Sequence, residues 1–258
     1  MPIDFQTLGD FRVRVWAEGS GSPLLYLHDF EQHPGGASFL QELAADRRVY
    51  APEHPGYGES TGFDAIDNLL DLVLFYRQLV ASWEVGPLDV VGHGLGGMIA
   101  AEFAAICPQF VRRLVLISPY GLWNDDVQLP DPFALPPDRF RQAKWHDPEK
   151  AADAEPSIFE ANGDDAFGDV LFRAQNLAVA TQFLWPIADH GLDKRLPLIE
   201  APVLLVHGES DGLVPASYAE EFAQRIPNAK VERIEAAGHL PMVEREDDFL
   251  RVVKEFLA

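Results

Sequence analysis

The sequence predicts an α/β fold, in which a mostly parallel, doubly wound sheet is flanked by helices and interrupted by one helical insertion. One observation is a series of short, β-branched apolar runs that lack polar alternation, as expected of strands covered on both faces. Another is the amphipathic helical pattern that follows most of these runs. The length of 258 residues suits one domain that carries an insertion.

The predicted strands are apolar runs bounded by turn residues. They are Phe11–Trp16, Leu24–Leu27, Arg48–Ala51, Leu88–Val91, Leu114–Ile117, Val203–Val206 and Val231–Ile234.

The predicted helices carry apolar residues at spacings of three and four. In the clearest, Ile66–Trp83, Asp64 and Asp67 are expected near the N-terminus, where negative charge is favoured, and Gly86 follows its end. The other strong helices are Leu95–Ile106, Ser217–Arg225 and Asp247–Leu257.

The strand-helix alternation stops between Tyr120 and Leu198, where prolines and aromatic residues are frequent. Proline-rich segments with short helical patches, such as the one predicted over Asp165–Leu184, are typical of an insertion. The sequence therefore predicts a core made of residues 1–119 and 199–258 and a helical lid over residues 120–198.

Composition excludes several classes of protein. The formal net charge of −21 would repel nucleic acid and anionic membrane surfaces. A single cysteine, Cys107, forms no internal disulfide, and the sequence shows neither a signal peptide nor an apolar run long enough to span a membrane. We expect a cytoplasmic protein that binds neither nucleic acid nor membranes; its oligomeric state is left open.

A glycine-dense turn joins the predicted strand at Leu88–Val91 to the helix at Leu95. Gly92, Gly94 and Gly97 match the G-x-G-x-x-G pattern of dinucleotide binding, but the acidic residue that would bind a ribose is missing from the end of the next strand. The alternative is a nucleophile elbow, G-x-S-x-G, with glycine at its centre. Glycine keeps the positive-φ backbone of such a turn but lacks the hydroxyl.

Two later motifs favour the elbow. Asp211 lies in a turn after the strand Val203–Val206, and His239 lies on a loop after Val231–Ile234. The chain order of elbow, Asp and His, together with strand ends that converge on one crevice, is typical of hydrolytic sites in such sheets.

With these motifs, and with Leu27-His28 and the segment Pro52–Ser60, the chain resembles the α/β-hydrolase superfamily, esterase-like and lidded, over nearly its whole length. The resemblance implies that Asp211 orients His239 and that His239 acts as general base above Gly94. It also implies an oxyanion hole formed by the backbone N–H groups of Leu95 and Phe30.

The chain departs from the family pattern at two points. Gly94 replaces the nucleophilic serine, which predicts a void the size of a hydroxymethyl group between it and His239. Asp29 stands where the family commonly has glycine, so a carboxylate is expected beside the oxyanion hole. His93, in the elbow, is expected to point away from the crevice. No zinc-type or helical His pair is present, so we predict no metal and no cofactor.

Three functions follow. The first is an esterase for small or medium apolar acyl compounds that has been inactivated by the loss of its serine. Removing that residue lowers the rate on the order of 10⁶-fold. The second is a serine-independent catalyst, a lyase, decarboxylase or isomerase, in which His239 and Asp211 activate water or abstract a proton. The third is a non-catalytic module that binds ligands in the hydrolase pocket.

Overall fold

The computed structural model describes residues 3–151 and 166–258. Its centre is an eight-stranded sheet in the order β1-β2-β4-β3-β5-β6-β7-β8. The strands are β1 (Ile3–Leu8), β2 (Phe11–Glu18), β3 (Ser22–Leu27), β4 (Arg47–Pro52), β5 (Leu88–His93), β6 (Val111–Ile117), β7 (Val203–Gly208) and β8 (Ala229–Ile234).

The sheet is parallel from β4 to β8, and only the pairs β1·β2 and β2·β4 are antiparallel. The predicted α/β fold class is confirmed, and every predicted strand lies within an observed one. Strand β1 was not predicted. Its residues are half-buried or exposed and mix polar with apolar side chains at the sheet edge, so they lack the continuous apolar run of the central strands.

The helices are α1 (Ser38–Ala44), α2 (Leu69–Ser82), α3 (Leu95–Ile106), α4 (Pro137–Lys144), α5 (Pro148–Ala151), α6 (Ala166–Leu184), α7 (Ser217–Ala223), α8 (Pro241–Glu244) and α9 (Glu246–Leu257). Helices α2, α3, α6, α7 and α9 correspond to the predicted ranges, whereas α1, α4, α5 and α8 were not predicted individually. Helix α2 begins later than expected because Asn68 caps it: its side chain accepts from the N–H groups of Leu70 and Asp71, and the Asp71 carboxylate accepts from Asn68 N. The predicted start at Asp165 lies outside the described residues.

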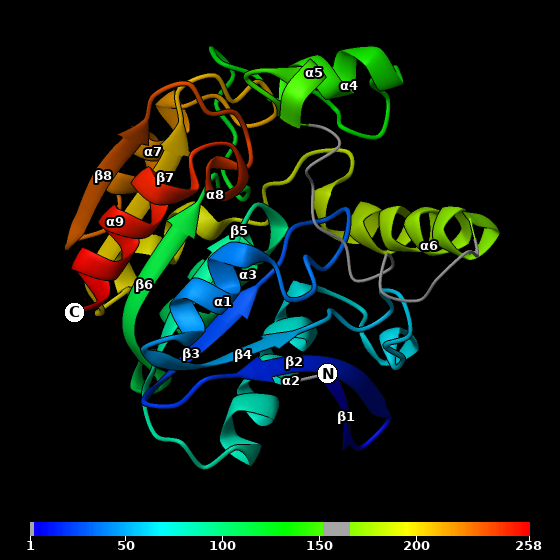
Figure 1. The fold of residues 1–258 in the computed structure, drawn as a ribbon, viewed down its shortest axis with the longest axis vertical. Coiled ribbons are helices and arrows are strands. Elements are labelled where there is room, and N and C mark those ends of the chain that lie inside the picture. The colour runs from blue at the N-terminus through cyan, green and yellow to red at the C-terminus, as the bar shows by residue number, and fades with distance from the viewer. Residues whose placement is uncertain (1–2, 152–165) are drawn as a thin grey trace.

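Helices cover both faces of the sheet (Figure 1). On one face α1 and α9 pack through Phe39, Leu40 and Phe249, and on the other face α2, α3 and α7 pack through residues such as Ile99 and Phe222. The central strands are therefore buried on both sides, which explains their apolar sequences.

The segment between β6 and β7 holds α4, α5 and α6 (Figure 1). The buried Asn176 on α6 bonds to two loops of the core: its Oδ1 accepts from Gly58 N at 3.0 Å, and its Nδ2 donates to Glu31 O at 2.9 Å. On the return to the core, Arg195 forms an ion pair with the buried Glu102 of α3. Polar contacts thus fix this segment over the loop that follows β3.

Within the described ranges, no helix has the length and apolar character required to cross a bilayer.

Candidate active site

The turn between β5 and α3 has the backbone of a sharp strand-to-helix elbow. Gly94 has φ 55° and ψ −114°, a conformation that glycine adopts without steric cost. Its N–H donates to Ile117 O at 3.0 Å, and its carbonyl accepts from Met98 N at 3.1 Å. The first N–H of helix α3, at Leu95, is therefore directed at the space above Gly94.

The neighbouring glycines are explained by packing. A Cβ at Gly96 would overlap the Leu27 and His28 carbonyl oxygens, and one at Gly92 would overlap the Gly96 carbonyl oxygen. A Cβ at Gly97 would lie 2.9 Å from Pro119 Cβ. The small residues at these positions let α3 approach β3 and β5 closely. Packing therefore accounts for the G-x-G-x-x-G pattern without a bound diphosphate.

Asp211 and His239 meet at the ends of β7 and β8. Asp211 Oδ2 lies 2.8 Å from His239 Nδ1, and Asp211 Oδ1 accepts from the N–H groups of Leu213 and Val214 at 3.0 and 2.9 Å. Both side chains are fully shielded from solvent. The carboxylate is thus held by its own turn and fixes the orientation of the imidazole.

Helix α4 supports both of these loops. The carbonyl of Ala143 accepts from Gly212 N at 2.8 Å, and the carbonyl of Lys144 accepts from His239 N at 2.7 Å. The segment between β6 and β7 therefore contributes to the positions of Asp211 and His239, although these residues lie on the loops that follow β7 and β8.

The predicted void above Gly94 is not present, because the Asp29 carboxylate fills it. Asp29 Oδ2 lies 3.0 Å from His239 Nε2, and Asp29 Oδ1 accepts from Leu95 N at 2.8 Å. A Cβ placed on Gly94 would overlap the carboxyl group of Asp29. Asp29 was expected beside the oxyanion hole, and its carboxylate accepts from the Leu95 N–H, one of the two donors that the resemblance assigns to that hole.

A chain of buried histidines holds the backbone at Asp29. His28 Nδ1 donates to Asp29 O at 2.7 Å, and His28 Nε2 accepts from His54 N at 2.9 Å. His54 Nε2 in turn donates to His28 O at 2.8 Å. Burial lowers the pKa of His54 to about 4 and that of His28 well below its usual value, so both rings are neutral near pH 7.

The site places an imidazolium between two carboxylates. Burial acts to lower the pKa of His239, but the charges and hydrogen bonds of Asp211 and Asp29 outweigh it and raise that pKa to about 10. For Asp29, burial is outweighed by His93, His239 and the Leu95 N–H, which lower its pKa to about 2. Near pH 7 both carboxyl groups are therefore ionised and His239 carries the proton.

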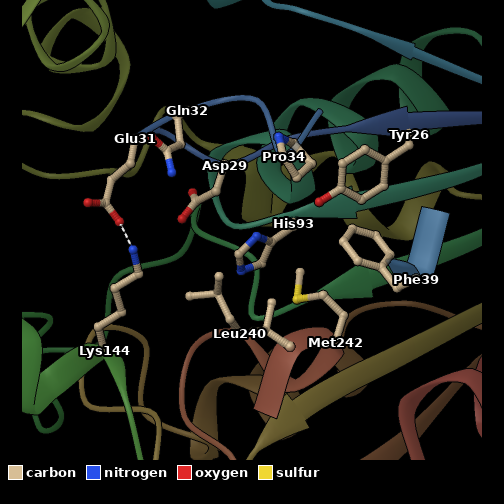
Figure 2. A pocket seen from close by; sticks show the side chains of 11 residues that line it. Tyr26, Asp29, Glu31, Gln32, Pro34, Phe39, His93, Lys144, Leu240 and Met242 are labelled. Atoms are coloured by element: carbon tan, nitrogen blue, oxygen red, sulfur yellow. Dashed lines mark hydrogen bonds and ion pairs between the residues drawn. The ribbon is translucent and has the colours of Figure 1, made fainter. Parts of the chain in front are cut away.

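His93 lies closer to the site than expected. Its Nε2 donates to His239 O at 2.8 Å, and it lines a cavity of about 30 Å³ together with Asp29 (Figure 2). The prediction that its side chain points away from the crevice is wrong, because the backbone of the His239 loop accepts its proton. At one end of this cavity Lys144 pairs with Glu31.

Asp29, His93 and His239 each offer a ligand atom within 4.8 Å of the others, so they are the described residues best placed to hold a metal ion. The imidazolium of His239 already supplies a positive charge between the carboxylates. Hydrogen bonds therefore account for the arrangement of these three side chains, and we assign no metal to it.

An apolar cleft of about 620 Å³ begins at Phe30, the residue after Asp29. The Phe30 ring is buried and lies about 6 Å, between ring centroids, from the rings of Phe133 and Phe140 (6.0 and 6.2 Å). Leu177 and Thr181 of α6 line the other side. The oxyanion role predicted for the Phe30 backbone stays a prediction, whereas its side chain forms one wall of this cleft.

Sequence reasoning missed two groups near the site. Tyr120 packs 6.0 Å, between ring centroids, from both Phe30 and His239, and its buried hydroxyl has no hydrogen-bond partner among the described residues. Lys144 was not singled out either, because nothing in the sequence shows that α4 returns to the His239 loop. The charge of Asp29 was noticed, but only the fold shows where its carboxylate lies.

The chain matches the family described as "Alpha/beta hydrolase family" over residues 20–252. This chain belongs to that family. It is 30% identical over 261 residues to a pimeloyl-[acyl-carrier protein] methyl ester esterase of Photobacterium profundum, covering 93% of this chain and 96% of that protein. It is 29% identical to the dihydrolipoyllysine-residue acetyltransferase component of an acetoin cleaving system of Cupriavidus necator, covering 98% of this chain and 68% of that protein.

Solved structures share this fold. A bacterial membrane phospholipase A superposes with a TM-score of 0.81 at 24% identity, covering 99% of this chain and 86% of that chain. A protein of Acinetobacter baumannii described as a "putative lipase" superposes with a TM-score of 0.74 at 20% identity, covering 99% of this chain and 90% of that chain. The relatives support a hydrolase of esterase type, and the α/β-hydrolase fold is established.

Proposed function

We propose that this chain is a hydrolase of small or medium apolar compounds that works without a serine, using Asp29 and His239 as its reacting groups. The observation that carries the proposal is the position of the Asp29 carboxylate. It bridges His239 Nε2 and Leu95 N in the space that a serine hydroxyl at position 94 would need.

Asp29 and Gly94 form a complementary pair. If a serine had simply been lost from an otherwise unchanged site, the remaining groups would surround a gap. Here the gap is filled by an ionised carboxylate that accepts hydrogen bonds from the helix N-terminus and from an oriented imidazolium. This favours the serine-independent interpretation over simple inactivation.

The proposed substrate is apolar. The cleft that begins at Phe30 is lined by Phe133, Leu135, Phe140 and Leu177, and a pocket of this kind binds through apolar surface while a few polar groups fix orientation.

The test compares Asp29→Asn and His239→Gln with Asp126→Asn, which removes an exposed carboxylate outside the site. Each variant is assayed against acyl esters, epoxides and haloalkanes. We expect the first two variants to lose 100-fold or more of any turnover shown by the unaltered chain, on the order of the usual contribution of an acid-base group, and the third to lose none. Turnover that is equal in Asp29→Asn and the unaltered chain would overturn the proposal.

A second candidate is an acyl ester hydrolase in which Asp29 blocks the oxyanion hole of a former serine enzyme. The esterase names of the relatives and the occupied Leu95 N–H favour it. Gly94→Ser alone is expected to stay inert, because the new Cβ overlaps the Asp29 carboxyl group. Ester hydrolysis by Asp29→Gly/Gly94→Ser, with no turnover of any kind by the unaltered chain, would establish this candidate instead.

A further inference from the structure

We propose that this chain pairs with a second copy of itself through the free edge of β8, so that the eight-stranded sheets of the two copies join into one. Strand β8 is the outermost strand beside β7 (Figure 1). The cleft that begins at Phe30 follows β3, and β5, β6 and β7 lie between β3 and β8 in the sheet. The proposed contact is therefore separate from the candidate active site, and it does not depend on the function proposed above.

The free edge of β8 presents a regular row of backbone groups. The carbonyls of Asn228 and Ile234 accept from N–H groups in or next to β7, at 2.9 and 3.1 Å. Alternate residues of a strand direct their backbone groups to the same side, so the even-numbered residues between these two also face β7. The odd-numbered residues face away from the sheet, and no described residue bonds to their N–H and C=O groups. These residues are Ala229, Val231 and Arg233.

Strand β8 lacks the usual structural protection of a sheet edge. Edges are commonly blocked by a proline, a bulge or a very short strand. All six residues of β8 pair with β7 without a break in register, and none is proline. The remaining means of protection is charge, and the exposed charged side chains of β8 have both signs. Such an edge repels a partner strand in some registers and attracts it in others.

Symmetry restricts the registers that two copies can adopt. Copies related by a two-fold axis perpendicular to the sheet pair antiparallel, and the residue on the axis faces its own equivalent. An axis through Lys230, Glu232 or Arg233 places like charges opposite each other, and an axis nearer either end of β8 leaves most of the free backbone groups unpaired. An axis through Val231 avoids both costs.

The register centred on Val231 satisfies the backbone and the charges together. Val231 then faces Val231 of the partner subunit, and Ala229 faces Arg233 of the partner subunit. These are the outward-facing residues, so each such pair exchanges both N–H···O bonds. Lys230 faces Glu232 of the partner subunit in a pair without backbone bonds, where opposite side chains approach most closely. The two-fold axis repeats this attraction on the other side of Val231.

The α9 face of the edge offers further contact area. Lys230 and Glu232 line a hollow of about 250 Å³ together with Arg251, Glu255 and the half-buried Phe256. Because the axis is perpendicular to the sheet, helix α9 of both copies lies on the same face. The two hollows therefore meet across the axis, with the pairs of Lys230 and Glu232 at their floor.

The charges of the edge also favour this surface over others. The net charge of −21 opposes contact between two copies in general. On β8, by contrast, Lys230 and Arg233 lie beside a single acidic residue, Glu232. Arg233 is already paired with Glu220 of α7 at 2.7 Å, so it brings no unbalanced charge against Ala229 of the partner subunit.

Sedimentation equilibrium over a dilution series tests the proposal. The unaltered chain should approach about twice its mass of 28.7 kDa. Lys230→Glu and Glu232→Lys each place like charges opposite each other twice, so each should raise the dissociation constant about 10-fold to 100-fold. The control Lys194→Glu makes the same change of charge at an exposed position outside β8 and should leave the dissociation constant unaltered.

Two further samples test the register separately from folding. The double variant Lys230→Glu/Glu232→Lys restores opposite charges in the same register and should recover the homodimer. A mixture of the two single variants should form a heterodimer, because every Glu of one copy then faces a Lys of the other. A variant that had failed to fold could not be recovered by mixing.

Loss of the dimer in both single variants, with recovery in the mixture and in the double variant, supports the proposal. The mass of one chain at every concentration of the unaltered chain overturns it. A dimer that neither charge reversal weakens also overturns it, since the contact then lies on another surface. Loss without recovery in the mixture overturns the register centred on Val231 and the proposal with it. None of these outcomes affects the assays of Asp29→Asn, which test the proposed function.

Discussion

The carboxyl group of Asp29 occupies the space that a Cβ at Gly94 would fill, although the two residues lie on different loops of the sheet. One side chain therefore excludes the other. The glycine at position 94 and the carboxylate at position 29 are therefore matched to each other, and each has to be tested with the other in view.

We predict that Gly94→Ala destabilises the chain more than Gly86→Ala does. Both glycines have positive φ, 55° and 74°, so both substitutions carry backbone strain of about 1 to 3 kcal/mol. Only Gly94 adds an overlap with Asp29, whereas nothing lies within 4 Å of a Cβ on Gly86. Denaturant unfolding of the two variants measures the difference.

Removing the overlapping group should relieve this cost. In a double-mutant cycle, Gly94→Ala is expected to cost less free energy in an Asp29→Gly background than in the unaltered chain. Equal costs in the two backgrounds would show that the Asp29 carboxylate does not stand above Gly94.

Much of the fold was predictable because central strands and amphipathic helices obey local rules. The apolar run Val203–Val206 and the periodic helix Leu95–Ile106 need only their own residues to be recognised. Strand β1 and helix α1 were missed, since a half-exposed edge strand and a seven-residue helix give weak patterns.

The site was predictable only in part. The order of Gly94, Asp211 and His239 can be seen in the sequence. Their proximity could be predicted because the strand ends of a parallel sheet converge. The place of the Asp29 carboxylate was not, because it depends on the distance between the β3 loop and the start of α3. The hydrogen bond from His239 N to Lys144 O was also invisible, since 95 residues separate the two along the sequence.

Asp211→Asn should move the titration of His239 to lower pH. Asp211 is the largest influence that raises the pKa of His239 to about 10, so removing its charge lowers that pKa. An imidazole that loses its proton earlier leaves the ion pair with Asp29 at a lower pH. NMR titration of the His239 imidazole measures the shift, and Asp126→Asn serves as the control. An unchanged titration of His239 in Asp211→Asn would show that the Asp211 charge does not hold the proton on this imidazole.

Stability should rise from about pH 4 to pH 6.5 because of the buried histidines. Burial lowers the pKa of His33 to about 3 and those of His54 and His93 to about 4. In the unfolded chain these groups bind protons below about pH 6.5, whereas in the folded chain they stay neutral. Their stabilisation is therefore complete above pH 6.5 and is lost as the pH falls towards the folded values.

Each of these histidines contributes a slope of up to about 1.4 kcal/mol per pH unit in that interval. Urea unfolding at a series of pH values measures the sum, and His33→Gln should flatten it by the share of one histidine. A free energy of unfolding that is constant from pH 4 to 6.5 would contradict the neutral, buried state of these rings.

Arg195→Met should destabilise the chain far more than Arg225→Met. Arg195 pairs with Glu102, whose side chain is 2% exposed, whereas Glu221, the partner of Arg225, is 27% exposed. Removing Arg195 leaves a buried carboxylate without its partner, at a cost of about 3 to 5 kcal/mol, while loss of an exposed pair costs about 0 to 1 kcal/mol. Thermal and urea unfolding compare the two variants. Arg195→Met/Glu102→Gln should recover part of the loss, since no charge then stays buried on α3, the helix whose first N–H holds Asp29.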